Sequence, residues 1–359
     1  MATKLNTSPQ KLLMALDVGG KGTKCICSLP GSTPISIWLD PEVIPIGYEA
    51  VKDVQNSSGA ADPENACWIG YDGHYVAVGY LARRKFWGNS RLAELKIATA
   101  PWKALAAIWV AAQKLKLGSK FEAVVWALLP GSEIGGAAQF KKDLTLMAAN
   151  FQTPTGPHQI KIEEFKCLPE GAGVFLSVTT KPEYVPVVRE KVVSVAMIGY
   201  RNASVINSWK GVLDVGGTSP LGMEKLVAAV ANKTGEDAEI LLKTIVTLGW
   251  NPIPNDTRGI RQGMLLEKAI KDAQESYWMA LRSWLLNTIP KDAGLLVFCG
   301  GTADYLRPVL EKEFGLHYKL DWHGPIMVSS RLDTRLLGNR LADAYGVFRL
   351  IIESQKVEK

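Results

Sequence analysis

The 359-residue sequence has few of the residues that build metal centres and disulfide scaffolds. It contains five cysteines and four histidines, and only Cys25 and Cys27 lie close together. No second cysteine or histidine cluster completes a zinc-ligand spacing. We interpret the cysteines as buried free thiols. The scattered histidines give little support for a metal site or a histidine-based catalytic triad.

Long apolar runs are also lacking. The opening "MATKLNTSPQKLL" is polar, without the apolar core of a signal peptide, and no later stretch has the unbroken length needed to cross a bilayer. A hydrophobic content of 47% with 21% charged residues is ordinary for a globular protein. We expect a cytoplasmic protein without membrane contact, and the chain length favours two domains.

No segment carries a strong excess of one charge. The formal net charge is +6, and its basic residues are spread over both halves, without a basic domain or tail. The densest basic spot, Arg83 to Lys85, lies beside Phe86 and Trp87. A surface for single-stranded nucleic acid needs several stacking platforms. We therefore interpret this spot as a solvated loop or a protein contact and expect no direct nucleic-acid binding.

Strand and helix patterns alternate along the first half of the chain. Two strands flank a glycine-rich turn in "MALDVGGKGTKCIC", and "PWKALAAIWVAAQKLK" has the proline start and apolar face of a helix. The remaining predictions are a strand at "ISIWL", a polar loop over 52–66, a hairpin at "CWIGYDGHYVAVG", a buried strand at "FEAVVWALLPG", a helix over 139–149, and strands leading to a turn and a helix in "HQIKIEEFKCLPEGAGVFL".

The second half repeats the opening plan without a visible sequence repeat. "KVVSVAMIGYRNASVINSWKG" again predicts a strand, a glycine-containing turn and a strand, and "GLLVFCGGTADYLRPVLEKEFG" predicts a strand, a Gly-Gly turn and a helix. Further helices are predicted over 222–234, 236–247, 258–288 and 332–353. The pattern as a whole predicts an α/β fold.

The first glycine turn has residues suited to holding an anion. Gly19, Gly20 and Gly22 let backbone N–H groups approach closely, and Lys24 adds a positive charge. Asp17 could hold a water of a hydrated Mg²⁺. The spacing is not that of a Walker A loop, because the next element is a strand. A hairpin without any ligand explains the isolated stretch equally well.

Four motifs, in order, resemble those of the actin, Hsp70 and hexokinase superfamily. Asp17 to Lys24, which includes Lys21 and Thr23, is similar to its first phosphate loop, and "PEGAG" resembles the connecting segment of ParM/StbA-type bacterial actin-like proteins. "FCGGTADYL" is similar to the adenosine loop, with Gly300, Gly301 and Thr302, and "LLGNRLADAYG" resembles the C-terminal helix of StbA-type chains. The resemblance implies two actin-like, ribonuclease-H-like domains around a nucleotide cleft. Their predicted bounds are 1–165, with helix 332–353 packing back on it, and 166–331.

The second phosphate loop departs from the family pattern. In "VAMIGYRNAS", Met197 stands where the resemblance implies a metal-associated aspartate, while Gly199, Arg201 and Asn202 remain. A rival register places the loop at "LDVGGTS", with Asp214, Gly216, Gly217 and Thr218. Its residues fit better but its position fits worse, and we favour the Met197 register.

The resemblance implies a protein that binds ATP and Mg²⁺, with Asp17 and Glu170 as catalytic residues. Glu170 would position the attacking water and Asp17 would hold the metal; loss of the second aspartate predicts slow hydrolysis. We expect ATP-dependent homopolymer filaments for plasmid segregation or a bacterial cytoskeleton, with a DNA-binding adaptor as a further partner. The alternatives are a sugar or other metabolite kinase of the same superfamily and a scaffold that binds nucleotide without turnover.

Overall fold

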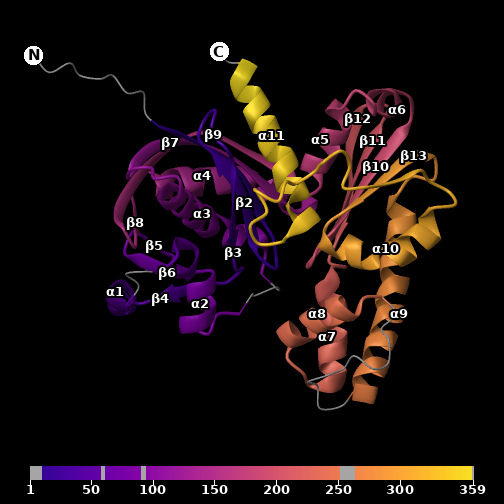
Figure 1. The fold of residues 1–359 in the computed structure, drawn as a ribbon, viewed down its shortest axis with the longest axis horizontal. Helices are drawn as coiled ribbons and strands as arrows, with labels where there is room; N and C mark the ends of the chain where they lie inside the picture. The colour runs from indigo at the N-terminus through magenta and orange to yellow at the C-terminus, as the bar shows by residue number, and fades with distance from the viewer. Residues whose placement is uncertain (1–9, 58–60, 90–93, 251–262, 358–359) are drawn as a thin grey trace, which may run out of the picture. The chain divides into compact units, whose positions relative to one another are not determined.

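The computed structural model describes residues 10–57, 61–89, 94–250 and 263–357. The chain divides into two compact units (Figure 1). The first unit combines residues 1–173 with 328–359, and the second consists of residues 174–327. Both are built on a sheet with helices packed against it, so the predicted α/β class is confirmed.

The sheet of the first unit has the strand order β3-β2-β1-β7-β9-β8-β5-β6-β4 in the described residues. Strands β1, β7 and β9 run parallel, and β2 returns antiparallel beside β1. The strands are β1 (Lys11–Val18), β2 (Thr23–Ser28), β3 (Ile35–Leu39), β4 (Val43–Ile46), β5 (Trp68–Tyr71), β6 (His74–Val78), β7 (Lys120–Leu129), β8 (Phe151–Thr153) and β9 (Gly156–Pro169).

Helices cover both faces of the parallel part of this sheet (Figure 1). Alternate residues of β1, such as Met14 and Leu16, pack with α3, whereas α11 lies against β1, β2 and β7. Burial on both faces explains why β1 and β7 are nearly continuous apolar runs. The α-helices are α1 (Tyr48–Ser57), α2 (Tyr80–Lys85), α3 (Ala100–Lys114), α4 (Ala137–Ala148) and α11 (Ala342–Val357). The described part of the unit also contains the 3₁₀ helices η1 (Pro63–Asn65), η2 (Lys96–Ala98), η3 (Gly131–Gly136) and η4 (Gly338–Leu341).

The second unit has a sheet of order β12-β11-β10-β13-β14 in the described residues. Helices α7, α8, α9 and α10 supply one core with alternate residues of β10, and α6 contacts β10 as well. The strands are β10 (Val192–Ile198), β11 (Ala203–Trp209), β12 (Val212–Ser219), β13 (Ala293–Cys299) and β14 (Leu320–Trp322). The helices are α6 (Val185–Glu190), α7 (Met223–Thr234), α8 (Ala238–Leu248), α9 (Gly263–Thr288) and α10 (Gly301–Phe314); α5 (Ala172–Thr180) begins at the end of the first unit.

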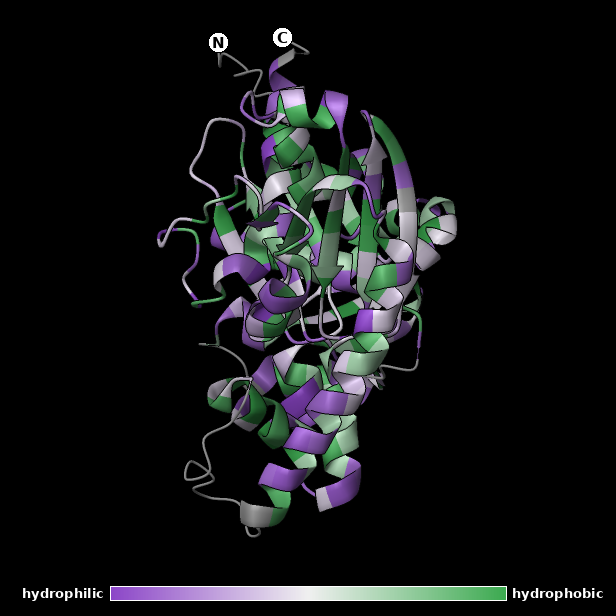
Figure 2. Ribbon diagram, turned by 90° about the vertical axis from the view of Figure 1, so that its right-hand side faces the viewer, coloured by the Kyte–Doolittle hydropathy of each residue, from purple (hydrophilic) through white to green (hydrophobic). Residues whose placement is uncertain are grey.

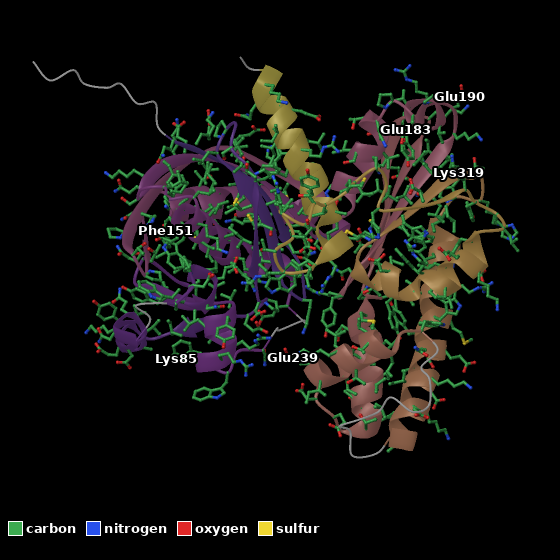
Figure 3. All side chains as sticks on the ribbon, viewed as in Figure 1. Lys85, Phe151, Glu183, Glu190, Glu239 and Lys319 are labelled. Atoms are coloured by element: carbon green, nitrogen blue, oxygen red, sulfur yellow. The ribbon has the colours of Figure 1, made fainter. Side chains whose placement is uncertain are left out.

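Hydropathy follows this architecture. In Figure 2 the central strands are mainly green, the colour of hydrophobic residues, whereas the helices mix green and purple. Phe151 of β8 is labelled in Figure 3 and is almost completely buried in the first unit. Lys85, also labelled there, ends α2 beside the exposed Trp87. Among the described residues, no helix is both long and apolar enough to span a membrane.

Most predicted elements are present. The Asp-Gly hairpin joins β5 to β6 with positive φ at Asp72 and Gly73, as its turn type requires. The predicted helix 101–116 is α3, and the helix predicted over 258–288 is α9 in its described part, since 251–262 lie outside the described residues. The cysteines are free thiols, four of them buried and Cys167 half-buried.

The loop predicted over 52–66 is wrong in its first part, where α1 continues to Ser57. Although α1 is mostly polar, it has two valines that lie three residues apart on one face of the helix. Val51 and Val54 are buried against Trp68, Ala77 and Leu81. Tertiary packing therefore stabilises a helix that composition alone does not indicate.

The helix predicted over 332–353 is also wrong at its start, because α11 begins at Ala342 after η4. Leu336 and Gly338 have positive φ, which a right-handed helix cannot include. The Asp333 carboxylate accepts hydrogen bonds from the backbone N–H groups of Leu337 (2.7 Å) and Gly338 (2.6 Å). This local bonding competes with helix formation until residue 338.

Candidate functional site

The first glycine turn lies between β1 and β2 in the first unit. Val18 pairs with Thr23 at its base, and Asp17 pairs with Lys24 one step earlier. A Cβ on Gly19 would lie 2.6 Å from the carbonyl oxygen of Gly22, and one on Gly22 would lie 2.2 Å from the Trp38 ring. A side chain at Gly19 would clash with the backbone of the turn, and one at Gly22 would clash with Trp38, so both positions need glycine.

Asp17 is buried beside this turn, and one of its oxygens, Oδ2, forms an ion pair with Lys24. Oδ1 of Asp17 and Oγ1 of the buried Thr23 have no hydrogen-bond partner within the described protein. A buried acceptor of this kind normally has a partner, such as an ordered water. The structure thus brings Asp17, Thr23 and Lys24 together, with polar atoms available to a ligand or to water.

Glu170 lies at the same edge of the sheet as Asp17. Asp17 pairs with Leu128 of β7, and Pro169 of β9 pairs with Leu129, so Asp17 lies near the carboxyl end of β1 and Glu170 follows that of β9, with β7 between the two strands. The Glu170 N–H donates to the carbonyl oxygen of Leu129 (2.8 Å). Open α/β sheets bind ligands at this edge.

The Glu170 carboxylate is buried and paired with Lys96 of η2 through its Oε1. Both side chains are only 6% exposed. Sequence reasoning did not identify Lys96, because it lies 74 residues from Glu170 in a stretch without a recognisable motif.

The turn after Glu170 is held by the C-terminal helix. The carboxylate of Asp343, in the first turn of α11, accepts the N–H of Gly171 (2.7 Å) and of Gly173 (2.7 Å). Gly171 has φ +93°, and a Cβ on Gly346 would lie 2.3 Å from the carbonyl oxygen of Gly173. The motif "LADAYG" was noted in the sequence, but this bonding role of Asp343 was not.

The second unit contains a turn of the same plan between β10 and β11. Met197 pairs with Ser204 and Ile198 with Ala203, as Asp17 pairs with Lys24 and Val18 with Thr23 in the first unit. Met197 also pairs with Cys299 of the parallel strand β13, as Asp17 pairs with Leu128. Met197 therefore occupies the position of Asp17 and presents a buried thioether instead of a carboxylate.

The rival register at Asp214 does not form a turn. Residues 212–219 are strand β12, and Asp214 pairs with Asn207 of β11 while it is exposed. Thr218 hydrogen-bonds Ser204 across the two strands, with 3.2 Å between their hydroxyl oxygens. The strand–turn–strand geometry therefore lies at Gly199 to Asn202, the register favoured from the sequence.

The Gly-Gly turn contacts the 199–202 turn within the second unit. The Thr302 hydroxyl donates to the carbonyl oxygen of Gly199 (2.8 Å), and the Gly199 N–H donates to the carbonyl oxygen of Asn202 (2.8 Å). Gly300 has φ +97°, and a Cβ there would lie 2.5 Å from the carbonyl oxygen of Ile198. Gly301 begins α10, and the carbonyl oxygen of Arg201 accepts the N–H of Gly222 (3.1 Å). Two sequence motifs a hundred residues apart thus form one cluster.

The fold matches solved structures over nearly its whole length. The actin-like protein Alp7A superposes with a TM-score of 0.67 at 16% identity, covering 97% of both chains. The chain has an actin-like fold. A 15-stranded ParM filament from Clostridium botulinum gives 0.64 at 13% identity, and Bacillus thuringiensis ParM with ATP gives 0.63 at 12%; each match covers 96% of this chain and 99% of the other.

Both units of this fold contain two strands joined by a glycine turn, β1 with β2 and β10 with β11. No protein-family model and no curated protein matches the sequence. The similarity to these structures is therefore one of backbone fold and not of sequence, because the identities are 12% to 16% in these matches. At that identity, the actin-like fold is shown and the roles of single residues are proposals.

Proposed function

We propose that this actin-like chain binds ATP with Mg²⁺, assembles into homopolymer filaments and hydrolyses the nucleotide slowly. The observation that carries the proposal is the full-length match to Alp7A and ParM structures, one of them a filament and one with ATP. In this proposal the filament acts in the cytoplasm in plasmid segregation, through a DNA-binding adaptor protein.

The residues of the first turn fit a hydrated Mg²⁺ and a phosphate chain. Asp17 is buried with one oxygen that has no hydrogen-bond partner among the described residues, and Gly19 and Gly22 add no side chains to the turn. Mg²⁺ keeps several of its waters and needs few direct carboxylates. Asp17 would hold the ion through a water, and Gly19 to Lys24, including Gly20 and Lys21, would surround the phosphates. The bound ion supplies charge neutralisation on the transferred phosphoryl group.

In this proposal the second unit would contribute to nucleotide binding without a second carboxylate. Met197 cannot accept a hydrogen bond from a metal-bound water as an aspartate does. Gly199, Arg201 and Asn202 would contribute backbone and side-chain donors, and Gly300 to Thr302 would border the adenosine. Because charge stabilisation dominates phosphoryl transfer, loss of this carboxylate should slow hydrolysis more than binding.

We assign to Glu170 the role of orienting the water that attacks the nucleotide. It follows β9 at the edge of the sheet that carries Asp17, and its backbone is fixed by Leu129 on one side and by Asp343 on the other. An ionised carboxylate there accepts a hydrogen bond from water and orients it. A metabolite kinase would need a comparable carboxylate facing a substrate hydroxyl, and no observation in the described residues favours that role.

The first test is high-speed sedimentation of the purified chain with Mg²⁺-ATP, with Mg²⁺-ADP and without nucleotide. We expect a pellet with ATP. The rate of phosphate release by Glu170→Gln should fall by about 100-fold or more. The variant should still pellet in the presence of ATP, because the carboxylate takes part in hydrolysis and not in ATP binding.

Lys161→Met is the matched control, since Lys161 forms an exposed ion pair with Glu122. It should leave pelleting and phosphate release unchanged. A chain that stays in the supernatant under all three conditions would refute the filament proposal. Phosphate release that is unchanged in Glu170→Gln would refute the assignment of that residue.

A further inference from the structure

The buried ion pair between Lys96 and Glu170 joins a residue that carries no motif to the residue we assign to catalysis. Lys96 belongs to η2, a short turn that precedes α3, and its ammonium contacts Oε1 of Glu170. Both side chains are almost fully removed from water. A lysine is rarely buried so completely unless it is paired.

The turn that carries Lys96 is fixed independently of Glu170. The backbone N–H of Ile97 donates to Oε2 of Glu133 (2.9 Å), a buried carboxylate of η3. The Ile97 side chain occupies the space where a Cβ on Gly136 would lie, 2.2 Å from Cδ1. Lys96 is therefore held in place by a second carboxylate and by packing. An accidental surface contact would not be supported in this way.

The physical consequence concerns the charge of Glu170. A buried carboxylate without a cation is driven towards its neutral form, since desolvation penalises the ionised one. Neutral Glu170 could not accept a proton or hold water through an ionised oxygen. The ammonium of Lys96 is the cation that the structure pairs with this buried carboxylate.

We propose that Lys96 is a positioning residue that keeps Glu170 ionised and fixes its orientation for nucleotide hydrolysis. The inference rests on the proposed function in that Glu170 is taken as the group that acts on water. The pairing itself does not depend on ATP and can be tested without it.

The other charged groups near Glu170 in the first unit do not replace Lys96. Asp343 of α11 binds the amides of Gly171 and Gly173, and Glu133 of η3 binds the amide of Ile97. Asp17 of β1 is paired with Lys24 of β2. Asp343, Glu133 and Asp17 are carboxylates and supply no positive charge, and the Lys24 ammonium is paired with Asp17.

The main experiment is the pH dependence of ATP hydrolysis in wild type, Lys96→Met and Lys96→Arg. In Lys96→Met we expect the acid limb to move up by about one pH unit or more, so that activity measured on that limb falls by about tenfold and recovers at higher pH. Lys96→Arg keeps the charge and should retain most of the activity. Lys161→Met, which removes an exposed lysine from the same unit, should leave the profile unchanged.

A second measurement does not require hydrolysis. The carboxyl carbon of Glu170, labelled with ¹³C and assigned by its absence in Glu170→Gln, is followed by NMR against pH in the nucleotide-free protein. It should titrate at higher pH in Lys96→Met than in wild type. The double variant Lys96→Met with Glu170→Gln should unfold at a higher temperature than Lys96→Met, because it no longer buries an unpaired carboxylate.

Two results would overturn the inference. One is a Lys96→Met protein whose pH profile and Glu170 titration both match wild type. The other is a loss of activity that is equal at every pH, which would make Lys96 a structural residue. If wild type hydrolyses no ATP, the proposed catalytic function fails, and the NMR titration still decides whether Lys96 controls the charge of Glu170.

Discussion

Single residues around the first turn show how burial changes charge. Glu42 lies just before β4, is buried, and has one carboxylate oxygen, Oε2, without a hydrogen-bond partner among the described residues. The pKa of Glu42 is raised to about 6, mainly by burial and also by nearby Asp40, while a backbone hydrogen bond and the charges of Arg83 and Lys21 act in the opposite direction. Because Lys21 belongs to the turn, the charge of Glu42 is coupled to a proposed phosphate-binding residue.

The raised pKa of Glu42 makes a prediction about stability. A carboxyl group whose pKa is higher in the folded than in the unfolded chain stabilises the fold below its unfolded value of about 4.5. This contribution is lost as the pH rises through about 6. Glu42→Gln should therefore raise the free energy of unfolding at pH 8 by about 1 kcal/mol, after allowance for solvent screening, and leave it nearly unchanged at pH 4.

Urea unfolding at the two pH values measures this difference. Glu49→Gln is the control, since Glu49 is an exposed residue paired with Lys52 on α1. It should change the free energy of unfolding little at either pH. A Glu42→Gln protein that gains equal stability at pH 4 and pH 8 would contradict the predicted titration.

The thiols illustrate a residue-scale prediction that the structure confirms. Cys25, Cys27 and Cys67 are completely buried, as expected from their apolar surroundings. Burial raises the pKa of Cys25 and Cys67 far above the ordinary value, and it raises that of Cys167 to about 12. These residues therefore act as small apolar side chains.

At the scale of elements, the C-terminal helix and the turn after Glu170 form one assembly. α11 packs against β1, β2 and β7, and Asp343 caps the beginning of α5 through two backbone N–H groups. Hydrogen bonds from backbone N–H groups to a buried carboxylate are among the stronger ones in proteins. The position of Glu170 thus depends on a residue 173 positions later in the chain.

Asp343→Ala should destabilise the first unit by about 2–4 kcal/mol, because two buried N–H groups lose their charged acceptor. Phosphate release should fall as well, since the turn that carries Glu170 becomes less fixed. Urea unfolding measures the first effect. Asp143→Ala, which removes a half-buried aspartate of α4 with an exposed hydrogen bond to Gln139, serves as the control. An unchanged unfolding midpoint in Asp343→Ala would show that the two bonds are not needed.

At the scale of the whole molecule, the first unit is discontinuous in sequence. Residues 328–359 belong with residues 1–173, whereas the second unit is one continuous segment, 174–327. Ala344, Val347, Phe348 and Ile351 of α11 are buried. Each large apolar side chain of this kind contributes about 1.5–3 kcal/mol, so the helix accounts for much of the 5–15 kcal/mol that is typical of a domain.

A chain truncated to residues 1–327 should therefore lose the cooperative unfolding of the first unit. The fragment 174–327 should retain a cooperative transition, since its core is assembled from its own residues. Circular dichroism against temperature separates the two outcomes. A truncated chain with the wild-type transition would contradict the assignment of α11 to the core of the first unit.

The α/β class, the order of most elements and the two strand–turn–strand segments could be predicted from the amino-acid sequence. These follow from local signals: apolar periodicity, glycine clusters and a proline at a helix start. It also indicated Asp17, Glu170 and the Gly-Gly turn, because each lies in a short contiguous motif.

Only the tertiary structure decided the rest. It formed α1 from a polar stretch, placed the second turn at Met197, and joined Lys96 and Asp343 to the segment around Glu170. The Lys96 contact spans 74 residues, and the two Asp343 contacts span 170 and 172 residues. Local pattern describes which conformations a segment favours. A local pattern does not indicate which distant residues will be packed nearby. Such residues affect the charge and position of buried groups.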